Sequence, residues 1–555
     1  MRAWWSELKR RNVVRMAVAY CALCWLLLQI ADLLMPTFGI PIWVMRALVL
    51  LAVLGFPLAL LFAWTYAWTA QGLQREVLAE PAPPSATPHH CAPQVPPIAA
   101  SIAVLPLVNM SSDKEQDYFS DGLSEELLNL LAQVPELHVA GRTSSFSFKD
   151  TQATIAQIGQ VLNVATVLEG SVRKSGAQVR ITAQLIETRS GYHLWSQTYD
   201  RQLTDIFAVQ DEIAVAVVAA LKLKLLPAHQ PSHAGHHVPG PEAYNHFLLG
   251  RQFLNRATEE GFRRACDEYA KALALEPDYA AALAGLALAE AYSADYTATD
   301  AQLLELRHRA RASAEAAVLR DPELGEAYTA RAVLRFVFEL DWDGGASDFR
   351  QALHFNPGDV MTLWQYSRLL AAQGKMTEAL AQAQAATRLD PLSAQAWEIQ
   401  SRYQIALGDF TGAQTALARA LDIAPEHGRA PAGMGLLHLL QGDAAAADSW
   451  YARTDNITFR LSGQAMAAYS GGRETASMQA LNELIDAEAH TSAYQIAEIL
   501  AWRNQRDAAF EWLQRAIAQR DAGIQYIKYD PALRHLRSDP RYREVLQQIG
   551  LPISA

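Results

Sequence analysis

Two long runs of apolar residues stand near the start of the chain, at residues 16–35 and 47–68. As helices, runs of about 20 residues are long enough to cross a hydrocarbon core about 30 Å thick. Pro36 and Pro41 lie between them, and proline ends a helix. The pattern predicts a hairpin of two transmembrane helices inside a membrane anchor that covers residues 1–76.

Basic residues flank the first apolar run more heavily than the second. Five precede the first run, and Arg46 is the single basic residue between the two. The positive-inside rule then places the amino terminus in the cytoplasm. Two crossings return the chain there, so we expect the soluble domains to face the cytoplasm. The alternative is a periplasmic position, which follows if only one run crosses.

A different pattern begins after a Pro/Ala-rich linker at residues 77–98 and extends over residues 99–226. Short apolar runs that suit strands alternate with stretches of helical spacing. Strands are predicted at residues 102–108, 137–139, 164–173, 179–187 and 192–200, and helices at 117–134, 154–162 and 204–226. Hairpin turns are expected at Ser175-Gly176 and Ser190-Gly191. This order predicts a compact α+β domain.

A His/Pro-rich linker at residues 227–241 leads to a third pattern, a repeat with a period of 34 residues. The glycines Gly374, Gly408 and Gly442 keep this step, and so do three prolines and three alanines: Pro357, Pro391, Pro425, Ala379, Ala413 and Ala447. Each unit reads as a helix, a turn at the glycine, and a second helix stopped by the proline. We therefore expect an all-α solenoid over residues 242–555 with a closing cap at its carboxyl end.

The repeats resemble the tetratricopeptide repeat (TPR), which has small residues where its two helices cross and proline at the exit. The preceding domain resembles the TolB-like amino-terminal domain. That similarity rests on Ser101–Pro106, on Asp117–Leu127, on Val167–Arg173 and on Leu194–Arg201. In this family the domain is commonly followed by TPR repeats. It occurs in bacterial adenylate cyclases and CadC-like signalling proteins, but neither a cyclase nor a DNA-binding domain is recognised here.

The predicted fold class is therefore multidomain: an α-helical transmembrane hairpin, an α+β TolB-like domain and an all-α TPR solenoid. The resemblance to bacterial proteins implies a position in the inner membrane. The bilayer is an expected partner of residues 16–68. The oligomeric state is left open.

Charge and cysteine content limit the classes of partner and cofactor that the chain is expected to bind. The net charge is −11, although residues 1–80 hold seven basic and four acidic residues. The rest of the chain is thus strongly acidic, which argues against nucleic acid as a partner. Four scattered cysteines, at positions 21, 24, 91 and 266, give no disulfide framework and no zinc site. We expect no metal and no cofactor.

Residue patterns of known catalytic sites do not occur in the sequence. A Gly-rich phosphate loop, a GxSxG elbow and an HExxH motif are all missing. Asp117, Asp121, Glu125 and Glu126 are expected to complement the dipole at the start of a helix. Arg142 to Ser145 follow a strand and could hold an anion, although a polar turn explains them as well. The chain is predicted not to be an enzyme.

The first helix of each repeat is expected to line the concave face of the stack. By the TPR resemblance, the groove-facing positions are Trp364, Arg368, Gln395, Glu398, Arg402 and Arg429. Arg368 and Arg402 stand one repeat apart at equivalent places. Guanidinium groups match carboxylates in geometry, so this pair could hold an acidic or carboxylate-bearing peptide. The alternative is two solvated arginines on a helix surface.

These features predict a non-catalytic, membrane-anchored scaffold or adaptor that binds proteins or linear peptides through its repeats. The alternative is a sensory subunit whose TolB-like domain binds a small ligand and relays that state through the repeats to a signalling enzyme.

Overall fold

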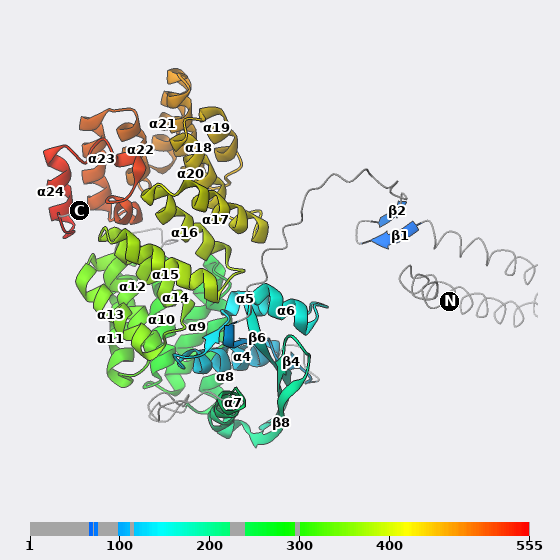
Figure 1. Ribbon diagram of the computed structural model, residues 1–555. Helices are drawn as coiled ribbons and strands as arrows, with labels where there is room; N and C mark the ends of the chain where they lie inside the picture. The colour runs from blue at the N-terminus through cyan, green and yellow to red at the C-terminus, as the bar shows by residue number, and fades with distance from the viewer. Residues whose placement is uncertain are drawn as a thin grey trace, which may run out of the picture. The chain divides into compact units, whose positions relative to one another are not determined.

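The computed structural model describes residues 98–111, 116–221, 239–294 and 300–553, together with two short strands near the start of the chain. These are β1 (Tyr66–Thr69) and β2 (Gly72–Arg75), which pair antiparallel. They belong to a first unit, residues 1–94, whereas residues 95–555 form a second compact unit. The second unit contains a mixed sheet and the helical repeats (Figure 1).

The transmembrane hairpin in the predicted fold class was wrong. In the part of the chain that the structure describes, no helix is both long and apolar enough to cross a bilayer. Residues 16–65 of the predicted hairpin lie outside the described residues. The end of the second run, residues 66–68, lies in strand β1 and not in a helix, which suits the β propensity of tyrosine and tryptophan. The described architecture is thus helical repeats with one small mixed sheet, without a transmembrane hairpin.

The mixed sheet has six strands, and five of them follow the order β5-β3-β6-β7-β8. Their bounds are β3 (Ile98–Val104), β4 (Val108–Asn109), β5 (His138–Val139), β6 (Val164–Ser175), β7 (Gln178–Glu187) and β8 (His193–Gln202). Strand β3 pairs in parallel with β5 and β6, β4 also pairs with β6, and β6, β7 and β8 form an antiparallel meander. The meander turns at Gly176 and Gly191, where φ is +59° and +72°, values that favour glycine.

Helices cover both faces of this sheet. The helices are α4 (Asp117–Ala132), α5 (Arg142–Phe146), α6 (Ile155–Leu162), the short η2 (Leu203–Asp205) and α7 (Ile206–Ala220). Alternate residues of β3 face opposite ways, as strand geometry requires. Ile102 and Val104 pack into the core with α4 and α7, whereas Ala103 packs in a smaller core with α6. The strands and helices follow one another in the predicted order, with the two-residue strand β4 and the helix α5 in addition.

One local expectation in this region was wrong, and the helices differ in how they begin. The residues after β5, read as a polar turn, form the five-residue helix α5. Asp205 precedes α7 but makes no capping hydrogen bond through its side chain. The Thr154 side chain, by contrast, accepts the N–H of Gln157 and begins α6 with a capping box.

The remaining described residues form eight helical hairpins in succession. The helices are α8 (Pro241–Leu254), α9 (Glu259–Leu275), α10 (Ala280–Ser293), α11 (Asp300–Arg320), α12 (Gly325–Leu334), α13 (Trp342–Phe355), α14 (Val360–Ala372), α15 (Met376–Leu389), α16 (Ala394–Leu407), α17 (Phe410–Ile423), α18 (Ala430–Leu440), α19 (Ala444–Tyr451), α20 (Ile457–Ser470), α21 (Glu474–Glu488), α22 (Ala493–Trp502) and α23 (Arg506–Gln519). Each even-numbered helix packs against the next odd-numbered one. The chain is therefore a TPR-like repeat protein over this region.

The periodic residues of the sequence lie at the turns and crossings of these hairpins. Gly374, Gly408 and Gly442 have φ between +81° and +85° and end the first helix of their hairpins. The periodic alanines Ala379 and Ala413 have no exposed surface, as expected where two helices approach closely.

The chain ends with a segment that folds back onto the middle repeats. It contains η6 (Ala522–Tyr526), η7 (Pro531–Leu533) and α24 (Pro540–Gln548). The indole Nε1 of Trp342, at the start of α13, donates to the Ile549 carbonyl over 2.6 Å. Lys528 donates to the Gln373 carbonyl over 3.0 Å. The expected closing cap therefore also contacts the third and fourth hairpins.

The α+β domain and the first hairpins share one hydrophobic core. Helix α4 packs along α8, and Tyr244 and Phe247 of α8 are buried together with Phe119 and Leu123 of α4. The domain boundaries proposed from the sequence stay predictions, but no gap in packing separates residues 116–221 from the first repeats.

Candidate binding groove

A groove of about 1090 Å³ follows the first helices of the hairpins. Its wall is formed by residues of α10, α12, α14 and α16, and the segment η6 closes one part of it. The other part is bordered by α4, α5 and α8. The α+β domain and the carboxyl-terminal segment thus both contribute to a groove that the repeats alone would leave wider.

One end of the groove is basic. Arg368 of α14, Arg402 of α16 and Arg429, which precedes α18, all line it. Arg402 forms a salt bridge with the buried carboxylate of Glu398, with both N–O distances 2.6 Å. Among the described residues, this is the one carboxylate that forms an ion pair with any of the three arginines.

The carboxyl-terminal segment supplies oxygen atoms to these arginines. Arg402 and Arg429 each donate to the phenol oxygen of Tyr526, over 3.1 and 3.2 Å. Arg368 donates to the side-chain oxygen of Gln525 over 2.8 Å. These phenol and amide oxygens orient the guanidinium groups, and the amide of Gln525 brings no negative charge.

The phenol of Tyr526 responds to this charge. Burial acts to raise its pKa, but the positive charges of Arg429, Arg402 and Arg368 outweigh burial and lower the pKa from 10 to about 7. The basic end therefore stabilises negative charge at the position of the phenol oxygen.

Aromatic rings also surround the arginines. The Arg368 guanidinium lies 5.5 Å from the ring centre of Phe336 and 5.8 Å from that of Trp364. Arg429 lies 4.7 Å from the ring centre of Phe459. These contacts restrict the arginine side chains before a ligand binds. Less conformational entropy is then lost on binding.

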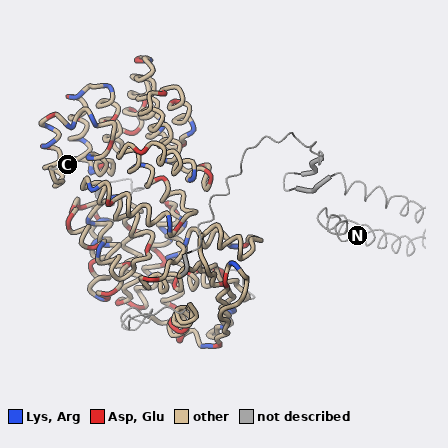
Figure 2. The backbone as a smooth tube through the Cα atoms, viewed as in Figure 1, with Lys and Arg blue, Asp and Glu red and all other residues tan. Residues whose placement is uncertain are grey.

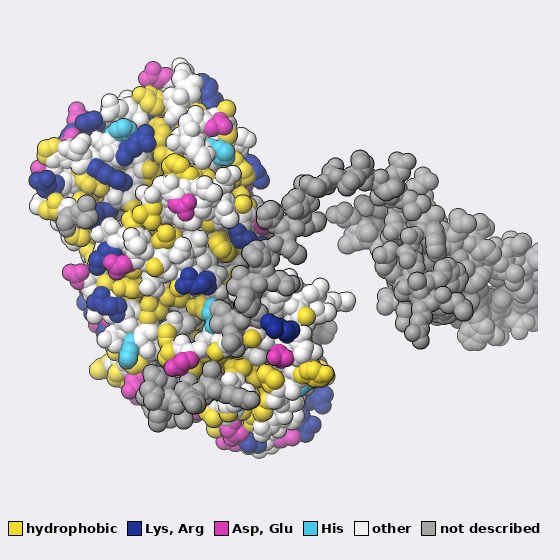
Figure 3. Space-filling view, in the orientation of Figure 1, with side chains coloured by type: hydrophobic (Ala, Val, Ile, Leu, Met, Phe, Trp, Pro, Cys, Tyr) yellow, Lys and Arg dark blue, Asp and Glu magenta, His cyan; other side chains and the backbone are white. Residues whose placement is uncertain are grey.

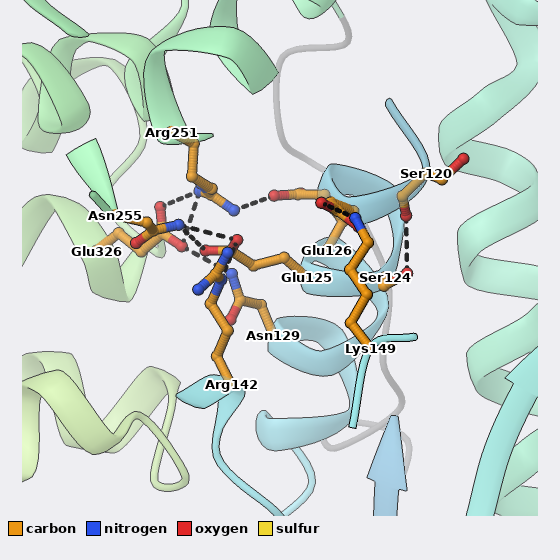
Figure 4. A network of polar contacts seen from close by, with 11 residues as sticks. Ser120, Ser124, Glu125, Glu126, Asn129, Arg142, Lys149, Arg251, Asn255 and Glu326 are labelled. Atoms are coloured by element: carbon orange, nitrogen blue, oxygen red, sulfur yellow. Dashed lines mark hydrogen bonds and ion pairs between the residues drawn. The ribbon is translucent and has the colours of Figure 1, made fainter. Parts of the chain in front are cut away.

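The other end of the groove contains a buried network of charges (Figure 4). Arg251 of α8 is only 8% exposed and lies between Glu126 of α4 and Glu326 of α12 (Figure 4). Its distance to Glu326 is 2.8 Å. Asn129 of α4 donates to the same Glu326 carboxylate over 3.1 Å. One arginine thus joins the α+β domain to two different hairpins.

Burial also changes the protonation of this network. Burial raises the pKa of Glu326 from 4.5 to about 7, although Arg251 opposes that change. The neighbouring carboxylates Glu126 and Asp359 raise it further. Asp359 caps α14 by accepting the N–H groups of Met361 and Thr362. The network holds more acidic than basic groups, so it favours protonation of one carboxylate.

A second contact between the domain and the repeats lies at α5. The backbone N–H of Ser144 donates to the carboxylate of Asp390, in the turn between α15 and α16, over 2.7 Å. In return, the Ser144 hydroxyl accepts the N–H of Leu392 over 2.8 Å. The residues that the sequence marked as able to hold an anion thus bind a carboxylate of the protein itself.

The structure brings the six sequence-predicted groove residues into one region. Trp364, Arg368, Gln395, Arg402 and Arg429 line the groove. Gln395 is exposed, whereas Glu398 lies behind the wall, buried and paired with Arg402. Whether they bind a peptide stays a prediction.

Sequence reasoning missed the groups that complete both ends. Tyr526 and Gln525 lie far along the chain and outside the 34-residue repeat, so the sequence carried no signal for them. Arg251 could have been found, because an arginine within the apolar helix pattern of Phe247 and Leu248 needs a buried partner.

Charged side chains elsewhere on the repeats are mixed. Figure 2 shows acidic and basic residues interspersed along the helices. On the face shown in Figure 3, hydrophobic and basic side chains lie side by side over the hairpins. Within the described ranges, no three His, Cys, Asp or Glu side chains are grouped so that they could hold a metal ion.

Comparison with known proteins gives one partial relative by sequence. No family model matches the chain. A protein of Rhizobium meliloti (strain 1021) that carries the name adenylate cyclase 3 is 38% identical over 228 residues, which cover 40% of this chain. The chain spans only 37% of the length of that relative.

Solved structures with similar folds are repeat proteins at low identity. PilF of Pseudomonas aeruginosa is 16% identical and covers 40% of this chain and 96% of its own, with a TM-score of 0.32. PilW, a type IV pilus biogenesis factor, is 21% identical over 35% of this chain and 91% of its own (TM-score 0.31). A tetratricopeptide repeat protein of Parabacteroides merdae is 13% identical over 44% of this chain and 93% of its own (TM-score 0.34). These similarities concern the fold alone.

Proposed function

We propose that this chain is a non-catalytic interaction protein whose groove binds an extended segment of a partner protein, with an anionic group of that segment at the basic end. The observation that carries the proposal is the convergence of Arg368, Arg402 and Arg429 on one wall of the groove, with one carboxylate among them. Guanidinium groups that line an accessible groove without full neutralisation favour an anionic ligand.

The dimensions of the groove support a peptide. Its volume of about 1090 Å³ lies just above the range of roughly 300–1,000 Å³ of small-molecule pockets. Its lining also alternates apolar residues, such as Leu288 and Ile399, with polar ones. A segment of this kind would bind with a dissociation constant on the order of micromolar, about −8 kcal/mol.

Calorimetric titration of the full chain with peptides tests this function. A peptide library that differs only in acidic content should show tighter binding for acidic members. Arg368→Gln should weaken that binding about tenfold or more, because a charge-assisted hydrogen bond contributes about 1.5–3 kcal/mol. Arg350→Gln is the matched control, since Arg350 is exposed on α13 and lies outside the groove lining. Equal binding of acidic and neutral peptides would exclude this function.

A second candidate is a sensory role for residues 99–226, which we propose to be a TolB-like domain. Its support is the pair of contacts that join this domain to the repeats, Ser144 with Asp390 and Glu126 with Arg251. The relative that carries the name adenylate cyclase 3 adds support, because TolB-like domains occur in adenylate cyclases. A small ligand of the domain could act on the groove through these contacts.

The sensory role is tested by thermal unfolding of the full chain with a panel of nucleotides, sugars and amino acids. A compound that raises the midpoint should also change hydrogen exchange at residues 389–392, where the domain contacts the repeats. A rise in the midpoint without any change at this contact would argue against relay.

A further inference from the structure

The basic end of the groove has a charge balance that suits a doubly charged ligand group. Three guanidinium groups line it and one carboxylate, Glu398, pairs with one of them. Two positive charges are therefore left without an ion-pair partner among the described residues. A carboxylate carries one negative charge, whereas a phosphate monoester carries about −1.5 to −2 near pH 7.

The directions of the donors also suit a group with several oxygen atoms. Nη1 of Arg402 and Nη1 of Arg429 converge on a single oxygen, that of Tyr526. Arg368 donates through its two terminal nitrogens to two other oxygens, of Gln365 and Gln525, both at 2.8 Å. Donors from three separate elements thus surround one region, which matches three oxygen atoms of a phosphoryl group better than the two oxygens of a carboxylate.

We infer that Arg368, Arg402 and Arg429 form a site for a phosphoryl group carried by the bound segment, with the phenol of Tyr526 as a further hydrogen-bonding partner. This inference rests on the proposed function, since it names the chemical class of the anion that the groove takes. In the bound state the phenol is neutral and donates its proton to a phosphate oxygen.

Other charged and titratable groups lie on the elements around Tyr526. Glu398 and Tyr403 lie on α16, His427 precedes α18, Tyr494 and Glu498 lie on α22, and Tyr529 and Asp530 follow η6. Asp530 accepts the phenol proton of Tyr494 over 3.0 Å. Burial, and next the nearby Asp530, raise the pKa of Glu498. Arg429 opposes that change, and a Glu498 that keeps its proton brings no negative charge to the arginines.

Binding should be linked to proton uptake. The lowered pKa of Tyr526, about 7, means that part of the phenol is ionised at neutral and mildly alkaline pH. A phosphate dianion beside it would raise that pKa again, because like charges disfavour ionisation. Above pH 7 the complex should take up protons in the wild-type chain and not in Tyr526→Phe. Calorimetry in buffers with different ionisation enthalpies measures this quantity.

The experiment compares three peptides of one sequence, with phosphoserine, aspartate or serine at one position, together with inorganic phosphate and phenyl phosphate. The phosphoserine peptide should bind the full chain about tenfold or more tightly than the aspartate peptide, since each added charge-assisted hydrogen bond is worth about that factor. Phenyl phosphate should compete with it. Arg429→Gln should remove most of this preference, and the exposed control Arg350→Gln should keep it.

The outcomes separate this inference from the proposed function. Equal binding of the phosphoserine and aspartate peptides would overturn the phosphoryl site and leave the groove as a binder of acidic segments. No binding of any peptide would overturn both. Inorganic phosphate that binds as tightly as the phosphopeptide would overturn the claim that the group arrives on a segment. If Arg429→Gln lowers the unfolding midpoint, its loss of binding could come from instability. Tyr526→Phe removes a single oxygen atom, so the absence of proton uptake in this variant still tests the site.

Discussion

The backbone amide of Ser144 donates to the carboxylate of Asp390, 2.7 Å away, although 246 residues separate them in the sequence. Asp390 is only 3% exposed, and the neighbouring N–H of Gly141 donates to the Leu389 carbonyl over 2.6 Å. The start of α5 is therefore held by a turn of the repeats. Neither part can move there without leaving buried polar groups unpaired.

Replacement of Asp390 by alanine should destabilise the chain by about 1–3 kcal/mol, because the Ser144 amide would lose its acceptor inside the protein. Asp390→Asn keeps an acceptor oxygen and should cost less. Urea unfolding and hydrogen exchange at residues 141–146 measure the effect. Asp422→Ala, at an exposed position of α17, is the control and should change neither. Unchanged exchange at α5 in Asp390→Ala would show that this contact does not hold the domain.

Arg251→Met should lower the free energy of unfolding by about 3–5 kcal/mol, more than Asp390→Ala. It removes the positive charge between the carboxylates Glu126 and Glu326. The matched control is Arg263→Met on α9. Arg263 pairs with Glu260, and both side chains are more than half exposed, so its loss should change the stability of the chain little. Chemical denaturation of both variants gives the comparison. Similar losses of unfolding free energy in the two variants would mean that the buried network contributes no more to stability than an exposed ion pair.

The stability of the chain should depend on pH through the titration of Glu326. Its folded pKa, about 7, lies above its ordinary value of 4.5. The folded chain therefore binds this proton more tightly than the unfolded chain. Its stabilising effect is complete below pH 4.5 and is lost as the pH rises to about 7. The difference in unfolding free energy between wild type and Glu326→Gln should therefore change between these values and be flat above them. A difference that is constant from pH 4 to pH 8 would contradict this pKa.

The repeats could be predicted from the sequence because their determinants are local and periodic. Gly408 and Pro391 mark where helices end, and Ala413 marks where two helices cross. The strands β6, β7 and β8 could be predicted for a similar reason, since each apolar run is bounded by a turn that contains glycine. In both cases the residues that determine the local structure lie within a stretch of about 30 residues.

The closed groove could not be predicted, because its causes are tertiary. Tyr526 contributes to the site only after the carboxyl-terminal segment has folded back over α14 and α16. Ser144 contacts Asp390 only once the domain has docked on the repeats. The helical reading of residues 66–68 failed for a different reason: a hydropathy pattern alone does not distinguish the last turn of an apolar helix from a short strand of Tyr66, Ala67 and Trp68.

Ala413→Leu should destabilise the fifth hairpin by roughly 1–3 kcal/mol through overpacking. Ala413 has no exposed surface and lies where α17 meets its neighbours. Ala418→Leu, on the exposed side of the same helix, adds the same atoms without a clash and should stay within about 0.5 kcal/mol of wild type. Thermal unfolding of both variants tests the packing. Equal midpoints would mean that the alanine period does not mark a close approach.

Gly408→Ala isolates the cost of backbone conformation at a repeat turn. Gly408 has a φ of +81°, and a Cβ atom added there would meet no other atom within 4 Å. The expected loss, about 1–2 kcal/mol, therefore comes from the left-handed backbone and not from a clash. Gly428→Ala is the control, since it is equally open but has no positive φ, and it should be neutral or stabilise by up to about 1 kcal/mol. Gly408→Asn should recover much of the loss, because asparagine tolerates this conformation and Asn504, with a φ of +60°, already occupies the corresponding turn between α22 and α23. Equal losses for the two alanine variants in chemical denaturation would assign the effect to something other than the backbone of the turn.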